Sequence, residues 1–232
     1  MESRNSQLYA VVYTLCDEAF KHLSGEKRDE IIKIIKEFSI FSAAMALAGN
    51  IVPGAGSILT AIGQTGLIWT LYVKINKIIG LEMSDNTAKF VGSAILTNLS
   101  LNAGTLLLGY AGAVVASFIP IFGQFTAAAI EASLGYALIY VSAVLYLIFL
   151  YKVFQVKGKI DITGGKEDDE IVKDVIKNTK LEELISEAKN KYKEDKNSGD
   201  IDYASKNLKC PVCGKTVDNS KEYCTKCGTK LM

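Results

Sequence analysis

Charged side chains are scarce through the middle of this sequence. Residues 38–151, 114 in number, carry three basic and three acidic residues, whereas the 57 residues that follow carry 12 and 13. A soluble domain has about one charged residue in four. The scarcity excludes an ordinary water-facing domain for the middle of the chain, which needs either lipid around it or an unusually well-covered core.

Residues that carry catalysis are also scarce. The sole histidine, His22, has no recognisable partner, and we expect it to be an ordinary surface histidine. A phosphate-binding loop of the form G-x-x-x-x-G-K-[ST] is absent: Gly54–Gly56 lacks the lysine, and Gly164-Gly165-Lys166 is more typical of a turn. The sequence therefore predicts that the chain is not an enzyme and has no GTPase domain of its own.

The five cysteines occur as two C-x-x-C pairs and a lone Cys16, and no secretory signal pattern opens the chain. In a reducing compartment such pairs bind metal rather than form disulfides, so we expect this end of the chain in the cytosol. Cys16 lies on an apolar helical face, where a small packing residue is the expected role.

The strongest motif is Cys210-x-x-Cys213-Gly, followed after a ten-residue spacer by Cys224-x-x-Cys227-Gly. Each C-x-x-C turn can place two thiolates on one metal, and the glycine after it relieves the tight knuckle. Four thiolates close the shell and leave no position for water, so we predict a structural Zn²⁺ ion. Residues 209–232 resemble the short zinc ribbons found at the ends of prokaryotic proteins.

Hydrophobic periodicity predicts an all-α fold in four parts. Residues 1–37 form amphipathic helices, the second capped by Ser24. Residues 38–152 form an apolar, membrane-associated domain of Gly/Ala-rich helical hairpins, in which small residues such as Gly104, Gly109 and Gly112 let helices approach closely. Residues 153–208 form a charged helical linker of solvated spacers with a capping box at Thr179, and residues 209–232 form the zinc ribbon.

The apolar domain contains an internal repeat. Pro53-Gly54-Ala55-Gly56 and Pro120-Ile121-Phe122-Gly123 share a P-x-x-G core at an offset of 67 residues, which pairs Leu67 with Leu134. Each unit is predicted to be a helix, a Pro-Gly corner and a second helix. A chance match of two apolar segments with the same turn is the alternative.

If each unit is a membrane hairpin, Lys74, Lys77, Lys89 and Lys152 all fall on the side of the chain ends. The positive-inside tendency then predicts a membrane protein with both termini in the cytosol. The first leg, residues 38–52, would be about 22 Å long, shorter than the roughly 30 Å hydrocarbon core. A re-entrant hairpin, or a soluble bundle that inserts only on cue, therefore remains an alternative.

Residues 51–150 resemble the YcjF-like helical domains that occur beside or fused to Era-like and Ras-like GTPases in bacteria. The matching features are a Pro-Gly corner, the stretch from Gln64 to Lys77 ending in Ile79-Gly80-Leu81, a break at Asn102–Gly104, and the corner at Ile119–Gly123. The resemblance implies membrane association and a GTPase as the partner, and it carries no catalytic residues.

The expected function is a membrane-associated scaffold or adaptor whose zinc ribbon is a cytosolic interaction module for a protein partner. One alternative is a homo-oligomeric pore, for which the candidate lining residues are Gln64, Asn98, Asn102, Gln124 and Glu131. A second is a regulator that binds nucleic acid through the ribbon. This second alternative is disfavoured, because five lysines with a single tyrosine make a weak nucleic-acid signature.

Overall fold

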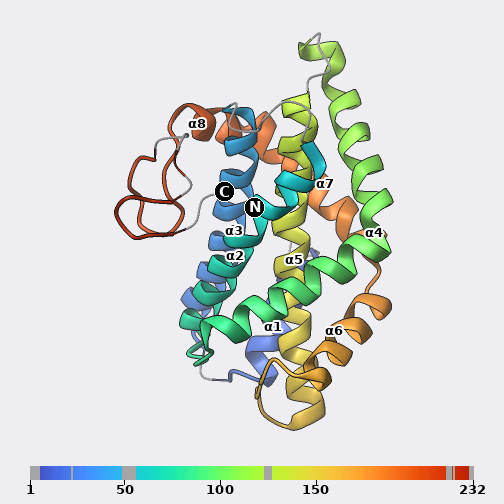
Figure 1. Ribbon diagram of the computed structural model, residues 1–232, viewed down its shortest axis with the longest axis vertical. Helices are drawn as coiled ribbons and strands as arrows, with labels where there is room; N and C mark the ends of the chain where they lie inside the picture. The colour runs from blue at the N-terminus through green and yellow to red at the C-terminus, as the bar shows by residue number, and fades with distance from the viewer. Residues whose placement is uncertain are drawn as a thin grey trace.

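The computed structural model describes residues 6–21, 23–48, 56–122, 127–217, 221 and 223–229; within them, the side chains of 56–64, 105 and 108–127 are left undescribed. Over these residues every regular element is a helix, which confirms the all-α fold (Figure 1). The helices are α1 (Gln7–Glu18), α2 (Gly25–Leu47), α3 (Gly56–Ile79), α4 (Asp85–Phe122), α5 (Ala127–Lys157), α6 (Lys166–Asn178), α7 (Leu181–Asn197) and α8 (Asp200–Lys206).

Helix α5 is the centre of the bundle. Its apolar residues from Ala132 to Val153 are buried, except the half-buried Ile148 and Tyr151, and helices α1, α2, α3, α4, α6 and α7 all pack against it. Among the described residues, the segment Ala128–Lys157 is the one helix long and apolar enough to cross a membrane, yet 78% of its apolar window is buried inside the fold. The core helix of a soluble protein has the same composition, so this helix is weak evidence for a membrane span.

Helices α3 and α5 run parallel to each other. Tyr72 of α3 donates its hydroxyl to the Ser142 carbonyl at 2.9 Å, and Asn76, one turn further along α3, accepts from Tyr146 of α5 at 2.6 Å. The rings of Tyr72 and Tyr146 stack with their centroids 3.9 Å apart. Because both helices begin at the same level, their first turns lie at one end of the bundle, which we call the apolar end.

The N-terminal helices follow the expected pattern. Ser24 accepts a hydrogen bond from the Lys27 amide at 3.4 Å, which confirms the predicted helix cap. The first half of α2 is amphipathic. Its second half, from Phe38 to Ala46, carries no charge, and all of its residues except the half-buried Ile40 are buried. This half of α2 therefore belongs to the core of the bundle.

Helix α4 differs from the expectation at two places. The predicted break at Asn102–Gly104 is wrong: the helix is continuous, although Figure 1 shows it changing direction about midway. The side chains of Asn98 and Asn102 donate to carbonyls four residues earlier in the same helix, at 2.9 and 2.7 Å, so they are compatible with helix. A Cβ added at Gly104 would meet nothing within 4 Å, so this glycine does not serve close helix packing.

The close helix approach is instead at Gly92, which sequence analysis missed. A Cβ added there would lie 2.6 Å from the Trp69 ring, so a side chain at this position would displace Trp69 of α3. The predicted corner at Pro120 lies within the last turn of α4, which continues to Phe122. Residues 51–55 and Gly123 lie outside the described residues, so the turns predicted at the two corners are not described.

The charged segment after α5 packs on the core and covers it. We expected residues 153–208 to be solvated spacers, but α6 packs on α4 and α5, α7 packs on the same two helices, and α8 packs on α2. Their apolar residues Ile171, Val172, Val175, Ile176, Leu184, Ile185, Ala188, Tyr192 and Ile201 are all buried in one core with the rest of the bundle. Charged helices thus supply the water-facing surface that the apolar helices lack.

Two tyrosines of α5 hold α7 through its carboxylates. Tyr136 donates to Asp195 at 2.7 Å, and Tyr140 donates to Glu187 at 2.5 Å. Glu187 also accepts from the backbone amide of Gln7 at 2.7 Å, at the first turn of α1. A carboxylate favours this position because the first amides of a helix have no partner within it. One side chain therefore joins three helices that are far apart in the sequence.

The loop before α6 is closed by Asp168, a buried carboxylate. Its Oδ2 atom accepts from the amides of Thr163 and Gly164, both at 2.8 Å, and Lys157 lies 3.0 Å from Oδ1. These glycine-loop amides are therefore satisfied by the protein itself, in agreement with a turn. The predicted capping box at Thr179 is wrong, because Thr179 donates to the Val175 carbonyl at the end of α6 while Lys180 precedes α7.

We predict that Asp168→Asn lowers the free energy of unfolding at neutral pH by about 1–3 kcal/mol, the value of a hydrogen bond to a charged group. Burial acts to raise the pKa of Asp168, but the hydrogen bonds from Lys157, Gly164 and Thr163 outweigh it and lower the pKa. The wild-type contribution is thus present above the unfolded pKa of about 3.9 and is lost as pH falls further.

Denaturant unfolding across pH measures this effect. The difference between wild type and Asp168→Asn should shrink below about pH 4, where the unfolded carboxyl takes up a proton. Asp161→Asn is the control, since Asp161 pairs with Lys159 at the surface and its side chain is 50% exposed. An Asp168 variant as stable as the Asp161 variant would contradict the prediction.

Candidate metal centre

Two backbone knuckles with the same geometry position the four cysteines. In the first, the Gly214 amide donates to the Cys210 carbonyl at 2.9 Å, with Gly214 at a φ of 70°. In the second, the Gly228 amide donates to the Cys224 carbonyl at 2.8 Å, also with a φ of 70°. Left-handed backbone favours glycine, which explains why a glycine follows each C-x-x-C pair.

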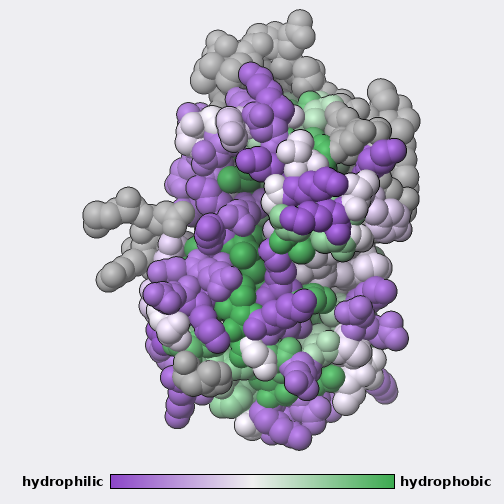
Figure 2. Space-filling view, turned by 90° about the vertical axis from the view of Figure 1, so that its left-hand side faces the viewer, coloured by the Kyte–Doolittle hydropathy of each residue, from purple (hydrophilic) through white to green (hydrophobic). Residues whose placement is uncertain are grey.

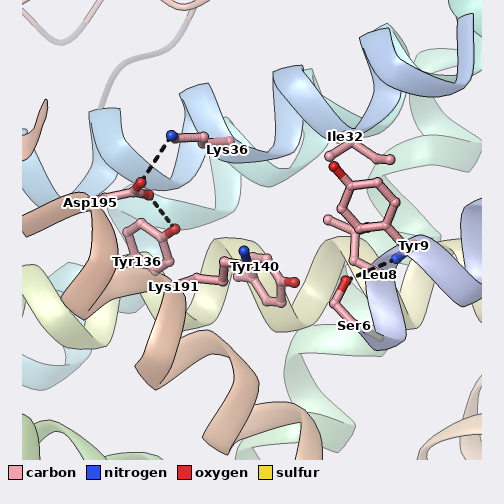
Figure 3. Close-up of a pocket in the computed structure, with 9 residues that line it drawn as sticks. All are labelled: Ser6, Leu8, Tyr9, Ile32, Lys36, Tyr136, Tyr140, Lys191 and Asp195. Atoms are coloured by element: carbon pink, nitrogen blue, oxygen red, sulfur yellow. Dashed lines mark hydrogen bonds and ion pairs between the residues drawn. The ribbon is translucent and has the colours of Figure 1, made fainter. Parts of the chain in front are cut away.

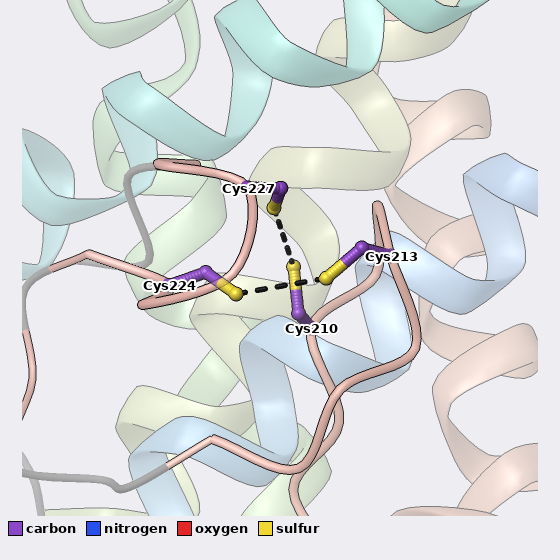
Figure 4. A group of neighbouring side chains, drawn as sticks. All are labelled: Cys210, Cys213, Cys224 and Cys227. Carbon is purple, nitrogen blue, oxygen red and sulfur yellow. Dashed lines mark hydrogen bonds between the residues drawn. The ribbon is translucent and has the colours of Figure 1, made fainter.

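The knuckles bring all four predicted ligands together. The sulfur atoms of Cys210 and Cys227 are 3.6 Å apart, as are those of Cys213 and Cys224, and all four lie within 4.8 Å of one another. Figure 4 shows the four sulfurs turned toward one another. Thiolates at the corners of a tetrahedron, about 2.3 Å from a zinc ion, lie about 3.8 Å apart, so the spacing fits a metal site.

The surroundings of Cys210, Cys224 and Cys227 shift the pKa values of their thiols in different directions. Burial raises the pKa of Cys210 to about 12. At Cys227 burial also acts to raise the pKa, but hydrogen bonds from the Thr229 hydroxyl and amide outweigh it and lower the pKa to about 6. The backbone amides of Lys226 and Cys227 lower the pKa of Cys224. A divalent cation would hold all four as thiolates, since a coordinating thiol is deprotonated.

The arrangement favours a structural role over a catalytic one. Catalytic zinc sites use three protein ligands and keep a fourth position open for water or substrate. Here four thiolates can fill a tetrahedron, and Cys210 and Cys224 are buried. The donor set is thus one that stabilises a fold, and the identity of the metal as zinc remains a prediction.

The ribbon is joined to the helical bundle, which sequence analysis did not foresee. The Lys74 ammonium of α3 donates to the carbonyl of Pro211 at 2.9 Å, and Pro211 lies between the first two cysteine ligands. Leu208, Cys210 and Cys224 are buried in the same core as the helices. The only signal for this contact in the sequence was the position of Lys74 at the end of an uncharged run.

The other candidate residues lie apart from this centre. Cys16 is buried in the core of α1, as expected for a packing residue, and Glu131 is partly buried near the start of α5. Asn98 and Asn102 lie on α4 and donate to their own helix. His22 lies outside the described residues, and the side chains of Gln64 and Gln124 are not described.

A second polar cluster lies between α2, α5 and α7. Figure 3 shows Asp195 between Lys36, whose nitrogen is 3.1 Å away, and the hydroxyl of Tyr136. Burial raises the pKa of Asp195 more than its two partners lower it. The cavity beside it measures about 20 Å³, which is room for one water molecule and too small for a substrate. The cluster therefore serves to join three helices.

No family model, curated protein or solved structure matches this chain in the three comparisons made. The resemblance to the YcjF-like domains therefore stays a prediction, and function has to be argued from the metal centre and the bundle themselves.

We predict that Cys213→Ser binds zinc at least about 100-fold more weakly than wild type, because a structural site loses one of four thiolates. Metal analysis of purified full-length protein, with competition by a chromophoric chelator, measures both stoichiometry and affinity. Cys16→Ala is the matched control, since Cys16 is a cysteine outside the cluster, and it should keep one zinc per chain. Equal affinities in the two variants would exclude the four-cysteine site.

Proposed function

We propose that this protein is a membrane-associated helical adaptor that touches lipid with its apolar end and holds a structural zinc ion in a cytosolic ribbon. The observation that carries the proposal is the separation of charge along the bundle. Residues 38–73 and 90–130 contain no charged residue at all, and they include the ends of α2 and α4 and the beginning of α3. Charge-free helix ends gathered at one end suit a contact with lipid.

Apolar side chains at this end support the contact. Leu47, the last residue of α2, and Ile130, in the first turn of α5, are only half-buried. Figure 2, which shows the left-hand side of the view in Figure 1, has hydrophilic side chains around a narrow hydrophobic strip. Large apolar side chains that stay in water gain about 1.5–3 kcal/mol each on full burial, so two such residues can contribute usefully to membrane affinity.

The packing of α5 agrees best with a bundle that docks on the membrane surface without crossing the membrane. Tyr136 and Tyr140 hydrogen-bond to carboxylates of α7, and a spanning α5 would have to give up both bonds. A single spanning helix would also separate the two chain ends. Association of the intact bundle with one leaflet keeps both ends on the cytosolic face, where the ribbon and a protein partner would meet. A GTPase is the partner that the YcjF-like resemblance suggests.

Zinc is the metal that the donor set favours. Four soft thiolate ligands in tetrahedral spacing select Zn²⁺ among the divalent cations that are common in cells. A closed four-thiolate site adds no catalytic position, which supports an adaptor rather than an enzyme.

We predict that Leu47→Lys lowers the partition of the protein onto phosphatidylcholine–phosphatidylglycerol vesicles by at least about tenfold, because an apolar contact at the end of α2 is replaced by a charge. Vesicle flotation of the full chain measures the partition. Val156→Lys is the matched control: Val156 is 56% exposed but lies near the other end of α5, and its replacement should have little effect.

Two results would count against this proposal. Wild-type protein that stays unbound at every lipid concentration would remove the membrane association itself. Release of an entrapped dye from the vesicles by wild-type protein would favour the pore instead, since a docked adaptor leaves the bilayer closed.

A further inference from the structure

The ribbon covers a particular apolar surface of the bundle. Lys74 of α3 reaches the carbonyl of Pro211 and lies 5.9 Å from the centre of the Phe38 ring of α2. Leu208 and Cys210, at the start of the ribbon, are 6% and 1% exposed. The ribbon therefore sits over the place where α2 and α3 meet, and its first knuckle forms the contact.

Helix α8 extends this cover along α2. Ile201 of α8 is fully buried, and α8 packs mainly on α2. Lys36 of α2 forms ion pairs with Asp195 at 3.1 Å and Asp200 at 3.5 Å, at the junction of α7 and α8. We call α8 and the described residues of the ribbon, 208–217, 221 and 223–229, the C-terminal clamp.

The surface under the clamp is apolar, and its exposure to water would be unfavourable. The second half of α2 is uncharged, and its buried residues include Phe38, Phe41 and Met45. Helices α5 and α8 both pack on α2, and Lys74, which holds the ribbon, lies over the Phe38 ring. Removal of the ribbon would take away the cover that it gives to this apolar site between α2 and α3.

The fold of the ribbon itself depends on the metal. Over its described residues the ribbon has no helix, and its strand-like pairing is limited to isolated bridges such as that between Lys209 and Thr216. A module of this size cannot form an adequate core, so metal binding supplies its folding free energy. The carbonyl that Lys74 holds belongs to the knuckle that carries Cys210 and Cys213. Metal binding and docking on α3 therefore stabilise the same loop.

We infer that the metal-loaded ribbon is the part of the clamp that covers the Phe38 end of the second half of α2, and that loss of the metal releases the ribbon and uncovers this apolar site. If the proposed membrane function is correct, release of the metal then increases the affinity of the protein for membranes. The ribbon then has a second role as a metal-dependent regulator of the lipid-binding bundle. Thermodynamic linkage requires the reverse effect as well: a weaker dock must weaken metal binding.

The reverse effect gives the first test, which involves no membrane. Lys74→Met keeps the length of the side chain and removes its hydrogen bond to Pro211, so the full chain should bind Zn²⁺ about three- to tenfold more weakly. Lys77→Met is the matched control, because Lys77 is exposed on the same helix and should leave the affinity unchanged. Equal affinities for the two variants would overturn the inference.

Hydrogen–deuterium exchange of the full chain, with and without a zinc chelator, gives the second test. Exchange in residues 38–46 of α2 should speed up on metal removal, while α6, which packs on α4 and α5, stays unchanged. Unchanged exchange in both, or equal acceleration in both, would overturn the clamp. If α2 is uncovered as expected but vesicle binding is absent in both states, the proposed membrane function fails while the clamp stands.

Discussion

Helix α5 carries no charge from Ala132 to Tyr151, and such a helix cannot face water around its whole circumference. Its burial is the constraint on which the other elements depend. Helices α1, α2, α3 and α4 cover part of it, and the charged helices α6 and α7 cover more of it while presenting their polar faces outward. The apolar middle of the chain and its charged C-terminal part are therefore two layers of one bundle.

A small set of polar contacts fixes this second layer. Carboxylates of α1, α6 and α7 each meet a polar group near or on α5: Glu18 accepts from Tyr151, Asp174 pairs with Lys152, and Glu187 accepts from Tyr140. Surface pairs of this kind contribute little to stability one by one. Their value lies in register, because each fixes where an amphipathic helix sits along α5. The ribbon is positioned in the same way, through Lys74 and Pro211.

The predictions that were confirmed rest on local patterns in the sequence. The spacing of Cys210, Cys213, Cys224 and Cys227 was enough to predict that they converge, and Ser24 before a helical run was enough to predict its cap. Predictions failed where partners are remote in sequence. The apolar faces of α6 and α7 were visible as periodicity, but nothing local says that they pack on α4 and α5. The expected break at Asn102 failed because an asparagine amide can bond to its own helix.

Whether the charged helices really cover α5 in water decides between this account and a chain that needs lipid to fold. Amide hydrogen exchange of the full-length protein in buffer free of detergent and lipid measures it directly. The account predicts a soluble protein in which residues 134–150 of α5 exchange slowest and the buried positions of α7 are also protected. Protein that stays soluble only in detergent, or an α7 that exchanges as fast as an unfolded peptide, would contradict it.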